Sequence, residues 1–238
     1  MNSTANRLKY AHNFAMEQGL YPILLSTILV LTFYYSRAYL SRDWVYRFLP
    51  WNLFLAWVPY LAGLAAAYLH RRRSRRWRLL LIPALVWLAF FPNAPYLVTD
   101  LVHLDWYHPI PIWYDIVLLS AAAWTGLFLA VFSLRSMQQI VQTYAGSLLS
   151  WGFVGLILGL TGLGVYLGRF LRWNSWDLLV YPARILTDIS DVILPPNLRA
   201  IGFILQVAAF MLVCYLTLTT VRPRSAIETA QDSHRWQP

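Results

Sequence analysis

Long apolar stretches separated by short polar segments dominate this chain. Five stretches without a charged side chain each have room for about one membrane-crossing helix, since about 20 residues rising 1.5 Å each span the hydrocarbon core. They lie between Glu17 and Arg37, Arg47 and His70, Arg78 and Asp100, Asp115 and Arg135, and Arg199 and Arg222. A longer stretch from Arg135 to Arg169 contains one more, rich in glycine and leucine. The pattern predicts an all-α, polytopic transmembrane helical bundle of about six spans.

The charges and prolines set the predicted boundaries. We expect an N-terminal segment at 1–17, a bundle at 18–221 and a C-terminal tail at 222–238. The predicted spans are 18–37, 48–70, 79–97, 114–135, 146–168 and 199–221. The third is irregular because Pro92 and Pro95 cannot donate backbone hydrogen bonds. It is therefore expected either to be short and tilted or to break within the membrane.

A different pattern follows the fifth span. In 177–195, Leu178, Ile185 and Val192 recur every seven residues, as do Leu179, Leu186 and Ile193. The charged side chains Asp177, Arg184, Asp188 and Asp191 fall on the opposite face. A helix divided in this way is typical of one that lies in the membrane–water interface. We therefore predict an amphipathic interfacial helix beside the bundle, with Pro182 near its start.

Composition supports a membrane location. Hydrophobic residues make up 59% of the chain and charged residues only 12%, against about 25% in soluble domains, so lipid must cover part of the surface. The net charge of +9 owes much to six arginines in residues 70–78. The positive-inside rule predicts that this loop is cytoplasmic, which places both termini inside. The arginines thus indicate orientation in a lipid bilayer and not nucleic-acid binding.

Polar side chains gather in the predicted outer loop after the third span. An Asp-x-x-His spacing occurs twice there, at Asp100/His103 and Asp105/His108. Residues three apart share one face of a helix, so each pair can chelate a divalent metal or couple a carboxylate to an imidazole base. Structural hydrogen bonding is the third interpretation. Asn93, between the two prolines, can repair the helix break or face a ligand cavity.

Two arginines stand out in the second predicted outer segment. Arg169 and Arg172 lie at an outer helix end, against the positive-inside trend. They are predicted either to pair with Asp100, Asp105 or Asp115, or to hold a phosphate or carboxylate of a substrate.

Glycines recur along the fifth span. Gly152, Gly155, Gly159 and Gly162 follow helical spacing and form one smooth stripe. Small residues let helices approach closely in lipid. The stripe predicts packing within the bundle, and its alternatives are a hinge or homo-oligomerisation.

Four strings along the chain support a family resemblance. They are Phe91-Pro-Asn-Ala-Pro-Tyr-Leu-Val-Thr-Asp-Leu-Val-His-Leu104, Trp113-Tyr-Asp115 with Ala123-Trp-Thr-Gly-Leu127, and Gly168-Arg-Phe-Leu-Arg-Trp-Asn-Ser-Trp-Asp177. Over about residues 50–220 the chain resembles the domain of unknown function family 1361. The resemblance implies a bacterial multi-pass membrane protein of uncharacterised activity and assigns no catalytic residue. We expect the protein to lie in the cytoplasmic (inner) membrane. The strings contain Asn93, Tyr96, Thr99, Asp100, His103, Asp115, Arg169, Arg172, Asn174 and Asp177.

The leading functional hypothesis is a site at the outer membrane face that acts on a lipid or lipid-linked molecule. In it, Asp100 and His103, with Asp115 as a further candidate, supply acid–base or metal chemistry, and Arg169 and Arg172 hold an anionic group. Asn93, Tyr96, Thr99, Asn174 and Asp177 are binding candidates. The alternatives are a small-molecule transporter that uses the broken third helix, and a non-enzymatic scaffold that assembles through the glycine stripe.

Overall fold

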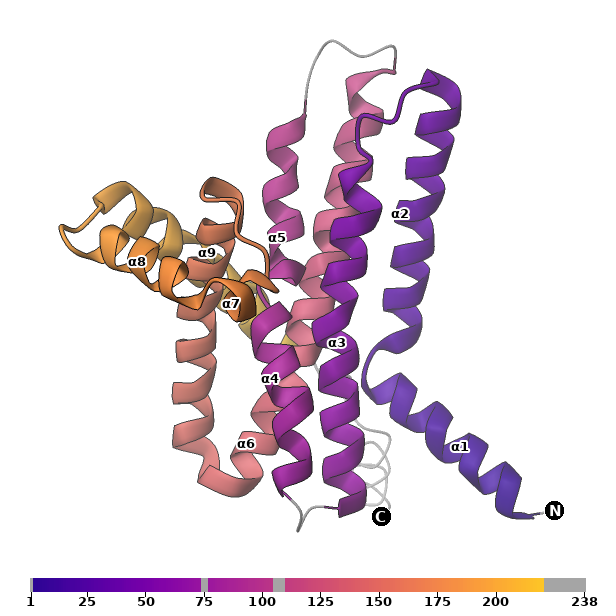
Figure 1. Ribbon diagram of the computed structural model, residues 1–238. Coiled ribbons are helices and arrows are strands. Elements are labelled where there is room, and N and C mark those ends of the chain that lie inside the picture. Colours follow the sequence, from indigo (N-terminus) through magenta and orange to yellow (C-terminus); the bar gives the residue numbers. More distant parts are fainter. Residues whose placement is uncertain (1, 74–76, 105–109, 221–238) are drawn as a thin grey trace, which may run out of the picture.

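The computed structural model describes residues 2–73, 77–104 and 110–220, and within these ranges its regular structure is entirely helical (Figure 1). The α-helices are α1 (Asn2–Glu17), α2 (Leu20–Ser41), α3 (Phe48–Arg73), α4 (Leu81–Phe90), α5 (Asn93–Thr99), α6 (Ile112–Phe170), α7 (Asp177–Val180), α8 (Pro182–Ile193) and α9 (Leu198–Thr220). Two short 3-10 helices, η1 (Trp77–Leu80) and η2 (Asp100–His103), precede α4 and follow α5. The predicted C-terminal tail lies outside the described residues, as does the predicted outer-loop segment 105–109.

Within the described residues, five helical segments are long and apolar enough to cross a membrane, which confirms the all-α transmembrane bundle. They are Leu20–Ser41, Phe48–Arg72, Trp77–His103, Ile112–Phe170 and Leu198–Thr220. The longest one, α6, reverses direction at Gly146, whose φ of 81° and ψ of 175° are accessible essentially only to glycine. Its two legs, 112–145 and 147–170, run in opposite directions in Figure 1. The first leg is helical through 136–145, which the prediction left between two spans.

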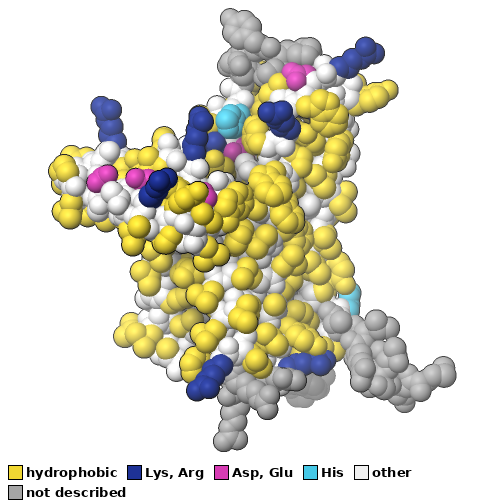
Figure 2. All heavy atoms as spheres, viewed as in Figure 1, with side chains coloured by type: hydrophobic (Ala, Val, Ile, Leu, Met, Phe, Trp, Pro, Cys, Tyr) yellow, Lys and Arg dark blue, Asp and Glu magenta, His cyan; other side chains and the backbone are white. Residues whose placement is uncertain are grey.

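The first leg of α6 lies at the centre of the bundle. α6 contacts α2, α3, α5 and α9, and its buried side chains include Leu118, Leu119, Leu129 and Leu134. In contrast, α1 leaves the bundle at the end where α3 meets η1 (Figure 1). Apolar side chains also cover the outside: Figure 2 shows a hydrophobic surface between charged side chains at the lower end and those at and above the level of α8.

The third predicted span is broken at its prolines. α4 ends at Phe90, and α5 begins at Asn93 after a two-residue turn. The amide of Asn93 donates to the Phe90 carbonyl at 2.9 Å, which satisfies an acceptor that the break would leave unpaired. The local repair predicted for Asn93 is therefore present.

The predicted amphipathic segment forms α7 and α8. Pro182 is in the first turn of α8, where its missing N–H costs no helical hydrogen bond. Ile185 and Val192 are buried, whereas Leu179, Leu186 and Ile193 are exposed. The apolar face thus divides between side chains that pack on the bundle and side chains left free to enter lipid. Its position in the interface stays a prediction.

The glycine stripe does not act as one packing surface. At Gly162 a Cβ atom would lie 2.3 Å from the carbonyl oxygen of Ile204, so the absence of a side chain lets α9 approach. At Gly152, Gly155 and Gly159 a Cβ would meet nothing within 4 Å. The prediction of packing within the bundle is therefore right for Gly162 and wrong for the other three, because α9 lies over only one edge of the stripe.

Candidate functional site

The site is built on the segment that follows the helix break. α5 is held in place by close contacts with both legs of α6. A Cβ on Gly126 would lie 2.3 Å from the Ala94 carbonyl oxygen, and one on Gly164 would lie 2.6 Å from a Pro92 side-chain carbon. Only glycine permits such approaches without a shift. The two contacts fix the direction in which α5 and η2 present their polar side chains.

Arg169, near the end of α6, is the centre of the polar cluster. Its Nη2 donates to Asp100 Oδ1 at 2.9 Å, and its Nε donates to Thr99 Oγ1 at 3.1 Å. Its Nη1 lies 3.1 Å from His103 Nε2, and its guanidinium carbon lies 4.8 Å from the centre of the Tyr96 ring. The structure therefore brings together Tyr96, Thr99, Asp100, His103 and Arg169, all of which the sequence had indicated.

Asp100 is almost fully buried, with 1% of its side chain exposed. Its second oxygen, Oδ2, accepts a hydrogen bond of 2.9 Å from the amide of Asn52 on α3. A buried carboxylate needs both a counter-charge and hydrogen bonds to offset its desolvation, and Arg169 and Asn52 supply them. Asn52 was not predicted. A polar amide inside an otherwise apolar span is the signal that would have found it.

The contact between Arg169 and His103 fixes the tautomer of the imidazole. A guanidinium has donors and no acceptor, so His103 Nε2 must carry a lone pair in this contact. The ring is therefore neutral, with its proton on Nδ1. It also packs against Phe48, at a centroid distance of 4.6 Å.

This arrangement bears directly on the acid–base and metal hypotheses. Arg169 occupies one Asp100 oxygen and the His103 lone pair, the two atoms that would bind a cation or exchange a proton. Both roles would therefore require the guanidinium to move. Among the described residues, no three His, Cys, Asp or Glu side chains are grouped as a metal site would need. Asp105 and His108, the other predicted metal pair, lie outside the described residues.

The chain leaves α6 through a tight turn that carries the other candidates. Arg172 has a left-handed backbone with a φ of 60°, and the N–H of Trp173 returns to the Leu167 carbonyl at 3.2 Å. Asp177 Oδ2 accepts from the backbone N–H of Asn174 at 2.8 Å and from its side-chain amide at 3.2 Å. Asp177 and Asn174 thus stabilise the turn, and Asp177 is not joined to the Arg169 cluster by a hydrogen bond.

A cavity of about 960 Å³ borders both the Arg169 cluster and the turn that follows α6. One end is polar, with side chains from η2, the end of α6 and the turn, among them His103, Arg169, Arg172, Asn174 and Ser175. The other part of the wall is apolar and comes from α4, the second leg of α6 and α8; Leu85, Leu88, Leu160 and Leu163 contribute to it. Asn93 also lines the cavity and donates to Ser175 Oγ at 2.8 Å. The volume is at the upper end of the range for small-molecule sites, about 300–1,000 Å³.

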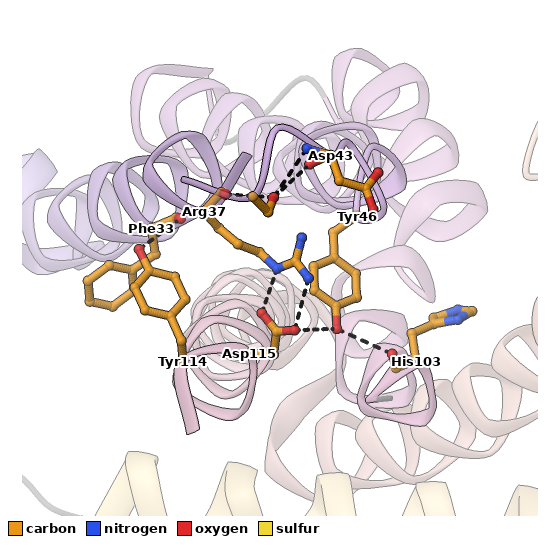
Figure 3. Close-up of polar contacts among 8 residues, drawn as sticks. Phe33, Arg37, Asp43, Tyr46, His103, Tyr114 and Asp115 are labelled. Carbon is orange, nitrogen blue, oxygen red and sulfur yellow. Dashed lines mark hydrogen bonds and ion pairs between the residues drawn. The ribbon is translucent and has the colours of Figure 1, made fainter. Parts of the chain in front are cut away.

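Asp115 belongs to a separate cluster, shown in Figure 3. Arg37 Nε and Nη2 donate to its two oxygens at 2.6 and 3.1 Å, and both side chains are buried. Tyr46 Oη lies 3.1 Å from Asp115 Oδ2 and 3.3 Å from the backbone oxygen of His103. The His103 ring points away from Asp115 (Figure 3). Within the described residues, Asp115 is thus connected to the cavity site through the Tyr46 hydroxyl and the backbone of His103.

Arg37 and Tyr46 were missed as partners of Asp115. Arg37 was interpreted as the polar end of the first span. The available signal was that an arginine at a predicted outer helix end opposes the positive-inside trend, as Arg169 does.

Comparison with known proteins places the chain in a family without assigning it an activity. No match was found among curated proteins or among solved structures. A family model described as "Protein of unknown function (DUF1361)" matches residues 51–214, which include every residue lining the cavity and exclude Arg37 and Tyr46. The matched segment is more than half of the chain, so this protein belongs to the DUF1361 family.

Proposed function

We propose that this protein binds a lipid or lipid-linked molecule in the cavity beside α8, at the outer face of a bacterial cytoplasmic membrane. The observation that carries the proposal is the division of a single cavity into a polar end and an apolar wall. A molecule with a hydrophilic head and a hydrocarbon chain matches both parts at once.

The surroundings of the cavity support a ligand that comes from the membrane. Two residues of its apolar wall, Leu88 and Leu160, are each 42% exposed, so lipid can reach this wall from the side. Leu179, another lining residue, projects from the segment with the unpacked apolar face. A chain entering from the bilayer would thus remain in an apolar environment throughout.

The geometry favours binding over chemistry by Asp100 and His103. Arg169 and Asn52 already occupy the carboxylate, and Arg169 occupies the imidazole lone pair. A general base needs a free lone pair within reach of the proton that it removes. The proposal therefore assigns these two residues to the architecture of the polar end.

The proposed orientation has support from the other end of the bundle. Arg71, Arg72 and Arg78 are exposed there, at the end of α3 and in η1, whereas α7 and α8 lie far from this end in Figure 1. Positive charge at that end is expected for the cytoplasmic side, with both termini inside. An impermeant thiol reagent applied to intact cells should label a cysteine at Asn174 and leave one at Arg78 unlabelled. Labelling at Arg78 alone would reverse the orientation.

The cavity is tested with a photoactivatable phospholipid in nanodiscs that contain the full-length protein. We expect cross-links to concentrate on the second leg of α6, on α4 and on α8, and Leu160→Trp to reduce them to background by filling the cavity. Leu156→Trp is the matched control because Leu156 lies on the same helix, is 61% exposed and does not line the cavity. Equal labelling in both variants, or labelling spread over all lipid-facing helices, would refute the proposal.

A second candidate role is homo-oligomerisation through Gly152, Gly155 and Gly159, whose open face leaves room for another helix backbone. Gly155→Leu should then dissociate a complex measured by mass photometry, and an unchanged particle mass would exclude this role.

A further inference from the structure

We infer that the ligand of the cavity carries an anionic head group, a phosphate or carboxylate, and that Arg172 is the residue that binds it. This inference rests on the proposed function and specifies the chemistry of the head. It divides the roles of the two arginines that the sequence had grouped together.

The charge of the cavity wall points to an anion. Of the residues that the structure describes, the wall contains two arginines and no aspartate or glutamate. The nearest buried carboxylate, Asp100, lies outside the wall and balances Arg169. Arg172, the second arginine of the wall, is in no ion pair with a described residue.

Arg169 is poorly available to a ligand. Its Nε, Nη1 and Nη2 atoms each contact a protein group, namely Thr99, His103 and Asp100. Its side chain is only 15% exposed. Binding an anion there would compete with a buried carboxylate that has no other charged partner among the described residues.

Arg172, in contrast, is available to a ligand. It is exposed, it lines the cavity, and it makes no hydrogen bond or ion pair with any residue in the described ranges. The acidic side chains close to it in sequence have other partners: Asp177 Oδ2 accepts from Asn174, and Asp188 Oδ2 accepts from Trp173 Nε1 at 2.6 Å. The five N–H donors of Arg172 are free to bind an anion in a bidentate manner.

The backbone at Arg172 determines which substitution tests its side chain. Its φ of 60° falls in the left-handed region, where glycine is the usual residue after a helix. Glycine adopts this conformation without a steric penalty. Arg172→Gly is therefore expected to remove the guanidinium and leave the turn intact.

Neighbouring groups complete an anion-binding surface. Ser175 Oγ accepts the Asn93 amide at 2.8 Å, which leaves its own O–H as a donor. Ser175, Asn174 and Arg172 line the same end of the cavity. Donors therefore outnumber acceptors where the head group would lie.

The test compares two lipids that differ only in the head. Full-length protein in phosphatidylcholine nanodiscs is supplied with equal small fractions of phosphatidic acid and diacylglycerol of identical acyl chains, and retained lipids are counted by native mass spectrometry. We expect the wild type to prefer phosphatidic acid by about tenfold, as for one added charge-assisted contact. Arg172→Gly and Arg172→Gln should bring the two lipids to parity.

Arg42→Gly is the matched control. Arg42 is also an exposed arginine with a left-handed backbone, φ 53°, directly after a helix, but it does not line the cavity. It should keep the wild-type preference, so an equal loss in Arg42→Gly and Arg172→Gly would overturn the inference. Equal retention of both lipids by the wild type would overturn it as well, while leaving lipid binding intact. Retention of neither lipid would instead refute the proposed function.

A further experiment distinguishes a lipid ligand from a soluble anion. Inorganic phosphate added to nanodiscs without phosphatidic acid should stabilise the protein far less than phosphatidic acid does. If phosphate stabilises the wild type equally and Arg172→Gln not at all, the anion site at Arg172 is supported and its natural ligand is a soluble anion.

Discussion

Among the described residues, two arginine–carboxylate pairs have a buried carboxylate, and they combine the same chemistry with opposite surroundings. Arg37 and Asp115 are 2% and 0% exposed and meet through two parallel hydrogen bonds. Arg169 and Asp100 are 15% and 1% exposed and share one hydrogen bond, because the other donors of Arg169 reach Thr99 and His103. The Arg37–Asp115 pair, which we call the closed pair, is buried and does not line the cavity. Arg169 of the second pair lines the cavity.

The difference shows how similar groups acquire different roles. A fork-to-fork pair satisfies both partners and joins α2 to α6, so it contributes to the architecture. The pair at the cavity distributes one guanidinium over three partners and orders the polar end of the cavity.

The largest expected effect comes from breaking the closed pair. Asp115→Asn would leave Arg37 buried without a counter-charge, and we expect the free energy of unfolding in detergent to fall by about 3–5 kcal/mol. The double variant Arg37→Met/Asp115→Leu should recover most of this loss, because a packed apolar pair needs no compensation. If single and double variants were equally unstable, the charge would not be the cause.

A smaller loss is expected at the cavity pair. Asp100→Asn retains the shape of the side chain but not the charge, and the partial exposure of Arg169 limits the cost to about 1.5–3 kcal/mol. Arg169 would then be free to bind an anion, so the preference for phosphatidic acid over diacylglycerol should rise. If Asp100→Asn lowered the free energy of unfolding as much as Asp115→Asn and left lipid preference unchanged, both pairs would contribute to the architecture alone.

The smallest effect is expected at the connection between the two regions. Tyr46→Phe removes the hydroxyl that lies between Asp115 and the His103 carbonyl, at an expected cost of about 1 kcal/mol and with lipid preference unchanged. Tyr114→Phe is the control, because the Tyr114 hydroxyl likewise joins two elements, α6 and α2, through the Phe33 carbonyl but touches neither pair. A change of lipid preference in Tyr46→Phe alone would show that the closed pair positions η2 for binding.

Much of the fold could be predicted because it depends on local sequence. The apolar stretches, the break at Pro92 and Pro95 and the amphipathic helix each follow from the composition of one segment. The reversal at Gly146 coincides with the predicted start of the fifth span, but the continuation of α6 through 136–145 was not predicted. No charge or proline interrupts that segment, so nothing in its sequence ends the helix.

The sequence predicted which residues belong to the candidate site, but not which side chains contact one another there. The sequence grouped Asp100 with His103 by their spacing, and the structure places Arg169 between them, from 66 or more residues along the chain. It also grouped Asp115 with them, and the structure pairs Asp115 with Arg37 instead. Spacing along one helix indicates which side chains share a face, but not which other helix that face will meet.

The sequence by itself determined that this chain is apolar enough to lie in lipid, that its regular structure is helical and where the third span breaks, because hydrophobicity and backbone preferences act over a few neighbouring residues. Only the tertiary structure decided which arginine is neutralised and which is left free, and which glycines are covered. Those outcomes depend on how each helix is rotated about its axis and which helix lies beside it, and contacts between residues far apart in the sequence set both.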